Sequence, residues 1–221
     1  MSELSRVLEP EVMDDDHEAR EYDEMDHGVV NAAFVDDLLA HRPALDRVLD
    51  VGTGTARIPL ELCRRAGTAR VVAIDLSPAM LAVAQKNVDA AGLGVRITLA
   101  RGDSKGIAEA DGAYTSVISN SIIHHIPAPA DALAEMARVL DRGGLLFVRD
   151  LFRPRDRAEL ERLVTLYAAR DTAAQRKLFA DSLGAALTVA EVRAAVAPLG
   201  VPAAAVEATS DRHWTLAWQR P

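Results

Sequence analysis

Several residue types and patterns are scarce in this chain of 221 residues, and each scarcity excludes a class of protein. Cys63 is the single cysteine, so no disulfide can form within the chain, as suits a reducing cytoplasm. No stretch approaches the roughly 18 apolar residues that a membrane helix needs. Met1–Asp16 is acidic and has no apolar core, so we expect neither a signal nor a transit peptide. We therefore expect a cytoplasmic protein without a membrane segment.

Positive charge is also in deficit, because 25 Lys and Arg face 33 Asp and Glu, which gives a formal charge of −8. Phosphate contacts need a basic face, so we expect no nucleic-acid partner. The composition, 49% apolar and 26% charged, is that of a globular protein and favours one α/β domain.

Short β-branched runs alternate with helical patterns from Arg47 onward, which is typical of successive βαβ units. The tight connection Thr209–Arg212 predicts that the last two strands are antiparallel. We expect Arg142–Gly144 to end the helix before the fifth strand. The expected strands are 47–51, 70–74, 95–99, 113–119, 145–148, 203–208 and 213–218, and the expected helices are 57–66, 77–91, 129–140, 155–169 and 188–197.

One further helical pattern precedes this region, over Glu18–Ala40, and Gly28 is expected to break or bend it. We therefore divide the chain into an N-terminal tail and lid helix, 1–46, and an α/β domain, 47–221. The second part contains a helical insert, 152–187, between the fifth and sixth strands.

Four predicted strands end in residues suited to one adenosine-containing ligand, since the carboxyl ends of parallel strands share one edge of a sheet. After the first strand, the turn Gly52–Gly54 lets the backbone approach a ligand closely. Asp75 follows the second strand and can accept both hydroxyls of a ribose. Asp103, after the third, can accept from the exocyclic amine of adenine. Asn120 ends the fourth strand, where we expect the reacting end of the ligand.

Other nucleotide sites fit less well. A dinucleotide fingerprint would need a third glycine at Arg57, which disfavours a nicotinamide dehydrogenase. No glycine turn is followed by Gly-Lys-Ser/Thr, so a Walker A loop is absent from the sequence.

The segments that carry these residues resemble, in order and spacing, the motifs of class I S-adenosylmethionine-dependent methyltransferases. The similarity is greatest to the small-molecule branch that includes the ubiquinone and menaquinone biosynthesis enzymes. The segments lie within 47–150 and are Val48-Leu-Asp-Val-Gly-Thr-Gly-Thr55, Ala73-Ile-Asp-Leu-Ser77, Gly102-Asp103, Asn120-Ser-Ile-Ile-His-His-Ile126 and Arg138-Val-Leu-Asp-Arg-Gly-Gly144.

This resemblance implies a Rossmann-like three-layer sandwich with a seven-stranded, mostly parallel sheet and an antiparallel last strand. It also implies S-adenosyl-L-methionine as the methyl donor and in-line displacement onto an acceptor, for which alignment of the two reactants supplies most of the catalysis. We expect the insert 152–187 to form much of the acceptor pocket. The donor contacts that we expect are Tyr22, Asp50, Gly52, Thr53, Gly54, Asp75, Leu76, Met80, Gly102, Asp103, Ser104 and Asn120.

Two positions depart from the family pattern. Ala56 stands where many members have a third glycine, which is a small change. Ser121–Ile123 differs from the Pro-Pro-aromatic motif of methylases that act on amino groups of nucleobases and amides, which puts those substrates in doubt.

His124 and His125 follow the fourth strand and are our candidate catalytic residues, with His125 preferred as a general base for a hydroxyl acceptor. The alternative is that both brace the loop. We expect no metal site, because no third ligand stands at a recognisable spacing from the pair. Tyr22 either contacts the sulfonium through its ring or packs as part of the apolar face of the lid helix.

Four arginines gather after the predicted fifth strand: Arg149, Arg153, Arg155 and Arg157. They either neutralise an anionic acceptor or pair with neighbouring acids on a helix surface. His213 and Arg212 reach the acceptor only if the turn before them folds back.

We expect a small-molecule acceptor; the alternatives are an RNA or protein methyltransferase and a non-catalytic donor-binding module. The acceptor's identity and the oligomeric state stay open.

Overall fold

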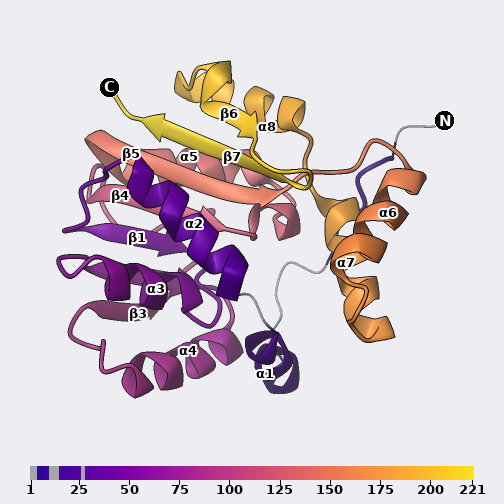
Figure 1. Ribbon diagram of the computed structural model, residues 1–221. Coiled ribbons are helices and arrows are strands. Elements are labelled where there is room, and N and C mark those ends of the chain that lie inside the picture. The colour runs from indigo at the N-terminus through magenta and orange to yellow at the C-terminus, as the bar shows by residue number, and fades with distance from the viewer. Residues whose placement is uncertain (1–3, 10–14, 26–27) are drawn as a thin grey trace.

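A seven-stranded sheet forms the centre of the protein (Figure 1). The computed structural model describes residues 4–9, 15–25 and 28–221. The strand order is β3-β2-β1-β4-β5-β7-β6; β7 is antiparallel to both neighbours, and the other pairs are parallel. This confirms the expected Rossmann-like α/β fold. The strands are β1 (Val48–Val51), β2 (Val71–Asp75), β3 (Ile97–Arg101), β4 (Tyr114–Asn120), β5 (Leu140–Leu151), β6 (Val206–Ala208) and β7 (His213–Gln219).

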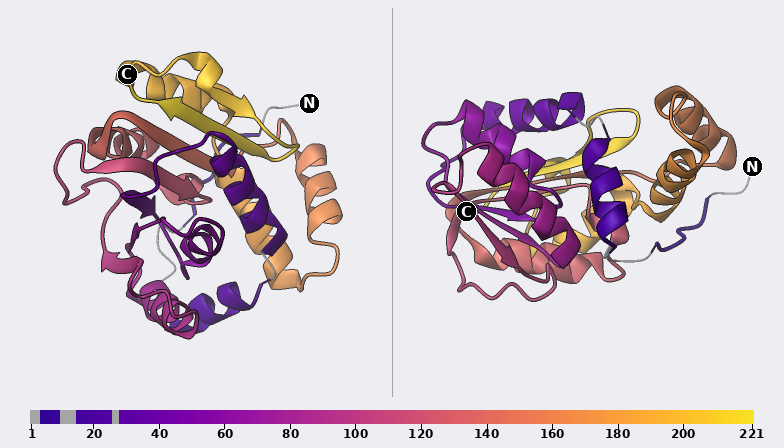
Figure 2. Two further views of the ribbon diagram at one scale, coloured as in Figure 1. Left: turned by 60° about the vertical axis from the view of Figure 1, so that its left-hand side comes forward. Right: turned by 90° about the horizontal axis from the view of Figure 1, so that it is seen from below.

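Helices cover both faces of this sheet (Figure 2). Side chains of α2, α3 and α4 form one core with it, and those of α5 and α8 form the other. Helices α6 and α7 pack on each other around a small core of their own beside the sheet. The helices are α1 (Asp16–Glu24), α2 (Gly28–Ala40), α3 (Arg57–Arg65), α4 (Pro78–Ala90), α5 (Pro129–Val139), α6 (Arg157–Tyr167), α7 (Ala173–Ala185) and α8 (Val189–Val196), with short 3₁₀ turns η1 (Ile123–His125), η2 (Ala197–Leu199) and η3 (Ala203–Ala205).

The two cores follow from the alternation of side chains along each strand. In β5, the Phe147 ring meets the Phe34 ring of α2 edge to face, with centroids 5.1 Å apart, while Leu146 and Val148 join the core under α5 and α8. Because both faces are covered, polar side chains that meet a ligand are confined to the strand ends. Within the described residues, no helix is both long and apolar enough to cross a membrane.

The glycine pair after α5 was wrongly predicted to be a helix stop. Helix α5 passes directly into β5 at Leu140, so the strand includes both Gly143 and Gly144. The pairing of β5 with β4 shifts register here, and Gly143 has a φ of +77°. A Cβ on Gly144 would lie 2.8 Å from the Thr115 carbonyl oxygen. The glycines therefore permit an irregularity in the sheet and a close strand approach.

Other differences lie at the ends of elements. Strand β3 begins at Ile97, two residues later than predicted, and residues 203–205 form a 3₁₀ turn instead of strand. Helix α7 was not predicted as a separate element, although Thr172 and Gln175 form a capping box at its start. The predicted N-terminal helix is broken into α1 and α2, and α2 begins at Gly28; residues 26 and 27 lie outside the described residues.

Candidate functional site

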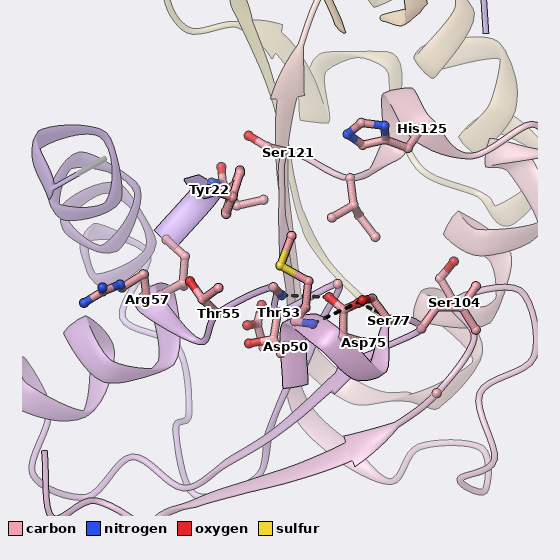
Figure 3. A pocket seen from close by; sticks show the side chains of 18 of the residues that line it. Tyr22, Asp50, Thr53, Thr55, Arg57, Asp75, Ser77, Ser104, Ser121 and His125 are labelled. Atoms are coloured by element: carbon pink, nitrogen blue, oxygen red, sulfur yellow. Dashed lines mark hydrogen bonds between the residues drawn. The ribbon is translucent and has the colours of Figure 1, made fainter. Parts of the chain in front are cut away.

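A pocket lies at the carboxyl ends of β1, β2 and β4, with Tyr22 of α1 at its rim (Figure 3). The pocket is a cleft that is partly open to solvent. All but one of the twelve residues predicted to contact the donor line this pocket: Tyr22, Asp50, Gly52, Thr53, Gly54, Asp75, Leu76, Met80, Gly102, Ser104 and Asn120.

The turn after β1 has the backbone conformation that its glycines permit. Gly52 and Gly54 have φ of +73° and +55°, a region that side chains with a Cβ adopt at a cost. A Cβ on Gly52 would lie 2.4 Å from Ile122 Cγ2, so the glycine also makes room for the loop after β4. The turn therefore brings backbone, not side chain, to the pocket.

Asp75 fixes this turn while facing the pocket. Its Oδ2 accepts the Gly54 N–H at 2.7 Å, and its Oδ1 accepts the Ser77 N–H at 2.9 Å. Burial raises the pKa of the Asp75 carboxyl. Each carboxylate oxygen has a second lone pair, which leaves Asp75 able to accept from a ligand's hydroxyls as well.

Asp50 is the most buried acid of the pocket, with 2% of its surface exposed. Burial, with a smaller contribution from the charge of Asp75, raises the pKa of Asp50 to about 7. Among the described residues, its Oδ2 has no hydrogen-bond partner, and neither has Asn120 Oδ1. Buried acceptors without donors are costly, so both oxygens suit a ligand that supplies N–H groups.

Helix α1 is fixed to the domain by an ion pair beside the pocket. Arg57 donates to both oxygens of Asp23, at 2.8 and 2.7 Å, and Asn87 Nδ2 donates to the same carboxylate at 3.0 Å. Arg57, which stands where a dinucleotide fingerprint would have its third glycine, therefore fixes α1, the helix that carries Tyr22. Burial, together with the charges of nearby acids, raises the pKa of the Tyr22 hydroxyl.

The two histidines of η1 occupy different environments. His124 is buried, its Nδ1 lies 2.6 Å from Asp150 Oδ1, and its backbone N–H donates to Asp150 Oδ2 at 3.0 Å. Burial opposes charging of this ring, but the nearby carboxylates of Asp150 and Glu9 together outweigh burial and raise the pKa of His124. His125 lines the pocket instead (Figure 3). The geometry therefore assigns His124 to the wall behind the pocket and His125 to its surface.

Three sets of predicted residues do not face the pocket. Asp103, the exception among the donor contacts, is half-exposed and pairs with Lys105 Nζ at 3.0 Å. The insert, whose residues are all described, packs against η1 without lining the pocket. The arginines pair with acids: Arg149 with Asp37 (2.6 Å), Arg153 with Glu191 (2.7 Å), Arg155 with Asp156 (3.3 Å) and Arg157 with Glu161 (3.1 Å).

The C-terminal turn also turns away from the pocket. The Arg212 guanidinium lies over the Tyr167 ring, 3.5 Å from its centroid, and His213 Nδ1 bonds Ser210 Oγ at 2.9 Å. Neither Arg212 nor His213 lines the pocket.

Several pocket residues were missed from the sequence. Asn31 enters from α2, where it is the one polar residue in the first six of that helix; this isolated polar side chain was a usable signal. Ile122 and Ile126 lie inside a motif that was quoted only for its polar residues. Apolar side chains beside a ligand follow the same pattern as core residues, so the sequence alone does not separate the two.

Comparisons with known proteins agree with this geometry. Residues 48–144 match the family model of a methyltransferase domain. A demethylmenaquinone methyltransferase of Thermus thermophilus is 39% identical over 110 residues, 50% of this chain and 49% of that protein. A ubiquinone/menaquinone biosynthesis C-methyltransferase of Dinoroseobacter shibae is 36% identical over 112 residues, 51% and 44% of the two chains. This chain thus spans about half the length of the curated relatives it matches.

The fold is shared more widely. A solved structure from Methanococcus maripaludis, named as a candidate S-adenosyl-L-methionine-dependent methyltransferase, superposes with a TM-score of 0.76 over 97% of both chains at 18% identity. The sequence match runs from β1 to the start of β5, and so includes β1, β2 and β4, whose ends form the pocket. The methyltransferase-domain match covers less than half of this chain, whereas the shared fold extends over nearly all of it.

Proposed function

We propose that this chain transfers a methyl group from S-adenosyl-L-methionine to a small-molecule acceptor. The observation that carries the proposal is the convergence of the Gly52–Gly54 backbone, the acids Asp50 and Asp75, and His125 on one pocket at the strand ends. A P-loop or a dinucleotide site would present different chemistry at this edge.

The residues present fit a nucleoside joined to an amino acid. Asp75 would accept the ribose hydroxyls, and Leu76 and Met80 supply apolar surface beside it. The partnerless oxygens of Asp50 and Asn120 would accept from the ammonium group of the methionine part. Gly52 and Gly102 allow close packing against Ile122 and Ile74 at the pocket, because a Cβ at either position would meet the isoleucine side chain.

When bound, this cofactor supplies a methyl group already activated by a sulfonium leaving group. The chain's own task is therefore to orient the acceptor and to exclude water. His125 is the pocket residue that we assign to the acceptor, and it would accept a proton where that acceptor is a hydroxyl. His124, bonded to Asp150, would position His125 from behind the pocket wall.

A small acceptor is supported by the charge and by the relatives. The net charge of −8 disfavours RNA, and the curated relatives quoted above are named for quinone biosynthesis. An anionic acceptor gains no support from Arg149 of β5 or from Arg153, Arg155 and Arg157 after it, because these arginines pair with acids of the chain.

Calorimetric titration with S-adenosylhomocysteine tests the donor site. Asp75→Ala should weaken binding by about 1–3 kcal/mol, or roughly 5- to 150-fold, because it removes the ribose acceptor. Asp89→Ala is the control: it removes an exposed acid of α4 that lies outside the pocket and accepts from Gln85 Nε2, and affinity should stay within about twofold. Equal losses in both variants would refute the assignment of Asp75.

Incubation of a metabolite extract with methyl-labelled donor then tests transfer and acceptor class. We expect label in a small metabolite, together with release of S-adenosylhomocysteine. Label in RNA or protein would replace the small-molecule proposal. Tight donor binding without transfer to any fraction would indicate a non-catalytic binding module.

A further inference from the structure

A cluster of three potential ligands, of which one is buried and two are partly buried, borders the pocket. Glu9 Oε2 lies 3.4 Å from His125 Nδ1 and 3.9 Å from His124 Nε2, and the three atoms lie within 4.8 Å of one another. The side chains of Glu9 and His124 are 8% and 4% exposed. His125 also lines the pocket, so the cluster reaches the surface at which an acceptor would bind.

The 3.4 Å separation matches that of ligand atoms around one ion, the 3.9 Å separation exceeds that range by 0.3 Å, and both are longer than charge-assisted hydrogen bonds. Ligands at about 2.0–2.2 Å from a tetrahedral ion stand roughly 3.3–3.6 Å apart, whereas a charge-assisted N–H···O bond measures about 2.7–2.9 Å. Glu9 Oε2 has no hydrogen-bond partner among the described residues. A carboxylate oxygen buried in this way needs a cation to offset its lost hydration.

Asp150 prepares His124 to act as a ligand. The Asp150 carboxylate lies 2.6 Å from His124 Nδ1 and also accepts the His124 and Leu151 backbone N–H groups. When Nδ1 carries the proton and donates it to Asp150, Nε2 presents its lone pair to the cluster. A carboxylate bonded to the far nitrogen of a histidine is the usual support of a metal-binding imidazole.

Glu9 reaches the cluster because the N-terminal segment is bonded across η1 and the insert. Arg6 Nη2 donates to the carbonyls of His124 and Ile126, both at 3.1 Å. The Val7 N–H donates to the Gly184 carbonyl at 3.1 Å. These contacts fix the segment beside the two histidines, which supplies the third ligand that sequence spacing did not reveal.

We propose that Glu9, His124 and His125 form a binding site for a divalent cation, with Zn²⁺ as the best match. Two histidines and a carboxylate are a common zinc donor set that leaves a fourth position open. The carboxylates of Glu9 and Asp150 balance the two charges of the ion. The proposal that this cluster binds a cation does not depend on the proposed methyl transfer.

One consequence rests on the proposed function. An acceptor hydroxyl in the fourth position would lose its proton to water more readily, because the cation stabilises the oxyanion. His125 would then act as a ligand through Nδ1, and the cation would replace it as the group that promotes deprotonation.

Titration of the chelator-stripped full chain with Zn²⁺, in competition with a chromophoric chelator, tests the site. We expect one equivalent per chain, and Co²⁺ should give visible absorption bands of a four- or five-coordinate site. Glu9→Gln and His125→Ala should each weaken Zn²⁺ binding by at least tenfold. Asp150→Asn should weaken it by about 10- to 100-fold, as loss of such supporting carboxylates typically does.

The exposed pair His17 and Glu21 on α1, 3.6 Å apart, offers the matched control. His17→Ala should leave stoichiometry and affinity unchanged. Circular dichroism of each variant in chelator verifies its fold, and Glu9→Gln serves if His125→Ala fails to fold. Zn²⁺ affinity that is unaltered by Glu9→Gln, or absent from the wild-type chain, would refute the site and leave an imidazolium–carboxylate cluster. Titration with S-adenosylhomocysteine in excess chelator keeps this failure distinct from failure of the proposed function.

Discussion

The contact between Gly52 and Ile122 gives a sharp test of the pocket's construction. Gly52→Ala places a methyl group at a φ of +73°, where the left-handed conformation costs about 1–2 kcal/mol. The new Cβ would also lie 2.4 Å from Ile122 Cγ2, about 1 Å inside ordinary contact. Overpacking of this kind costs about 1–3 kcal/mol. The free energy of unfolding should therefore fall by roughly 2–5 kcal/mol in total.

Gly200→Ala separates the two contributions. Gly200 has a φ of +79°, and a Cβ there would meet nothing within 4 Å, so the variant carries the backbone cost alone. Urea unfolding should show Gly52→Ala to be less stable than Gly200→Ala by about 1–3 kcal/mol. For a chain of this size that difference corresponds to about 2–12 °C in Tm.

The double variant Gly52→Ala with Ile122→Ala tests the contact itself. Ile122→Ala removes Cγ2 and Cδ1, which leaves only the Ile122 Cβ at 3.0 Å. The double variant should thus show a favourable coupling free energy of at least about 1 kcal/mol in a double-mutant cycle. Equal stability of Gly52→Ala and Gly200→Ala, or additive effects in the cycle, would refute the contact as the reason for glycine at this position.

Three further predictions concern the acid in the pocket, the core and a helix cap. S-adenosylhomocysteine should bind up to about tenfold more tightly at pH 8 than at pH 6, because Asp50, with its pKa near 7, ionises over this range and then attracts the ligand's ammonium. Calorimetry should show this rise abolished in Asp50→Asn; a rise that persists would contradict the assignment. Phe147→Ala should lower the free energy of unfolding by about 3–5 kcal/mol, because the ring is 1% exposed and packs on Phe34; a loss below about 1 kcal/mol in urea unfolding would argue against this packing. Thr188→Ala should cost about 1 kcal/mol through loss of the α8 cap, and Thr188→Ser should restore it in the same assay.

The sequence by itself determined the features that depend on neighbours along the chain. Short β-branched runs located the strands, and helical apolar patterns located most of the helices, because both kinds of pattern are set within a few residues. The strand-end position of Asp50 and Asp75 followed from the rule that parallel strands share an edge.

Only the tertiary structure decided which distant side chains meet. It brought Glu9 to the histidines of η1, bonded Asp150 to His124, and set Ile122 against Gly52. It also turned Asp103 toward Lys105 and gave an acidic partner to each of Arg149, Arg153, Arg155 and Arg157. Local patterns encode the period of the backbone, whereas contacts between distant residues depend on how whole layers pack. The pocket's outline could therefore be predicted from the sequence, and the cluster beside it could not.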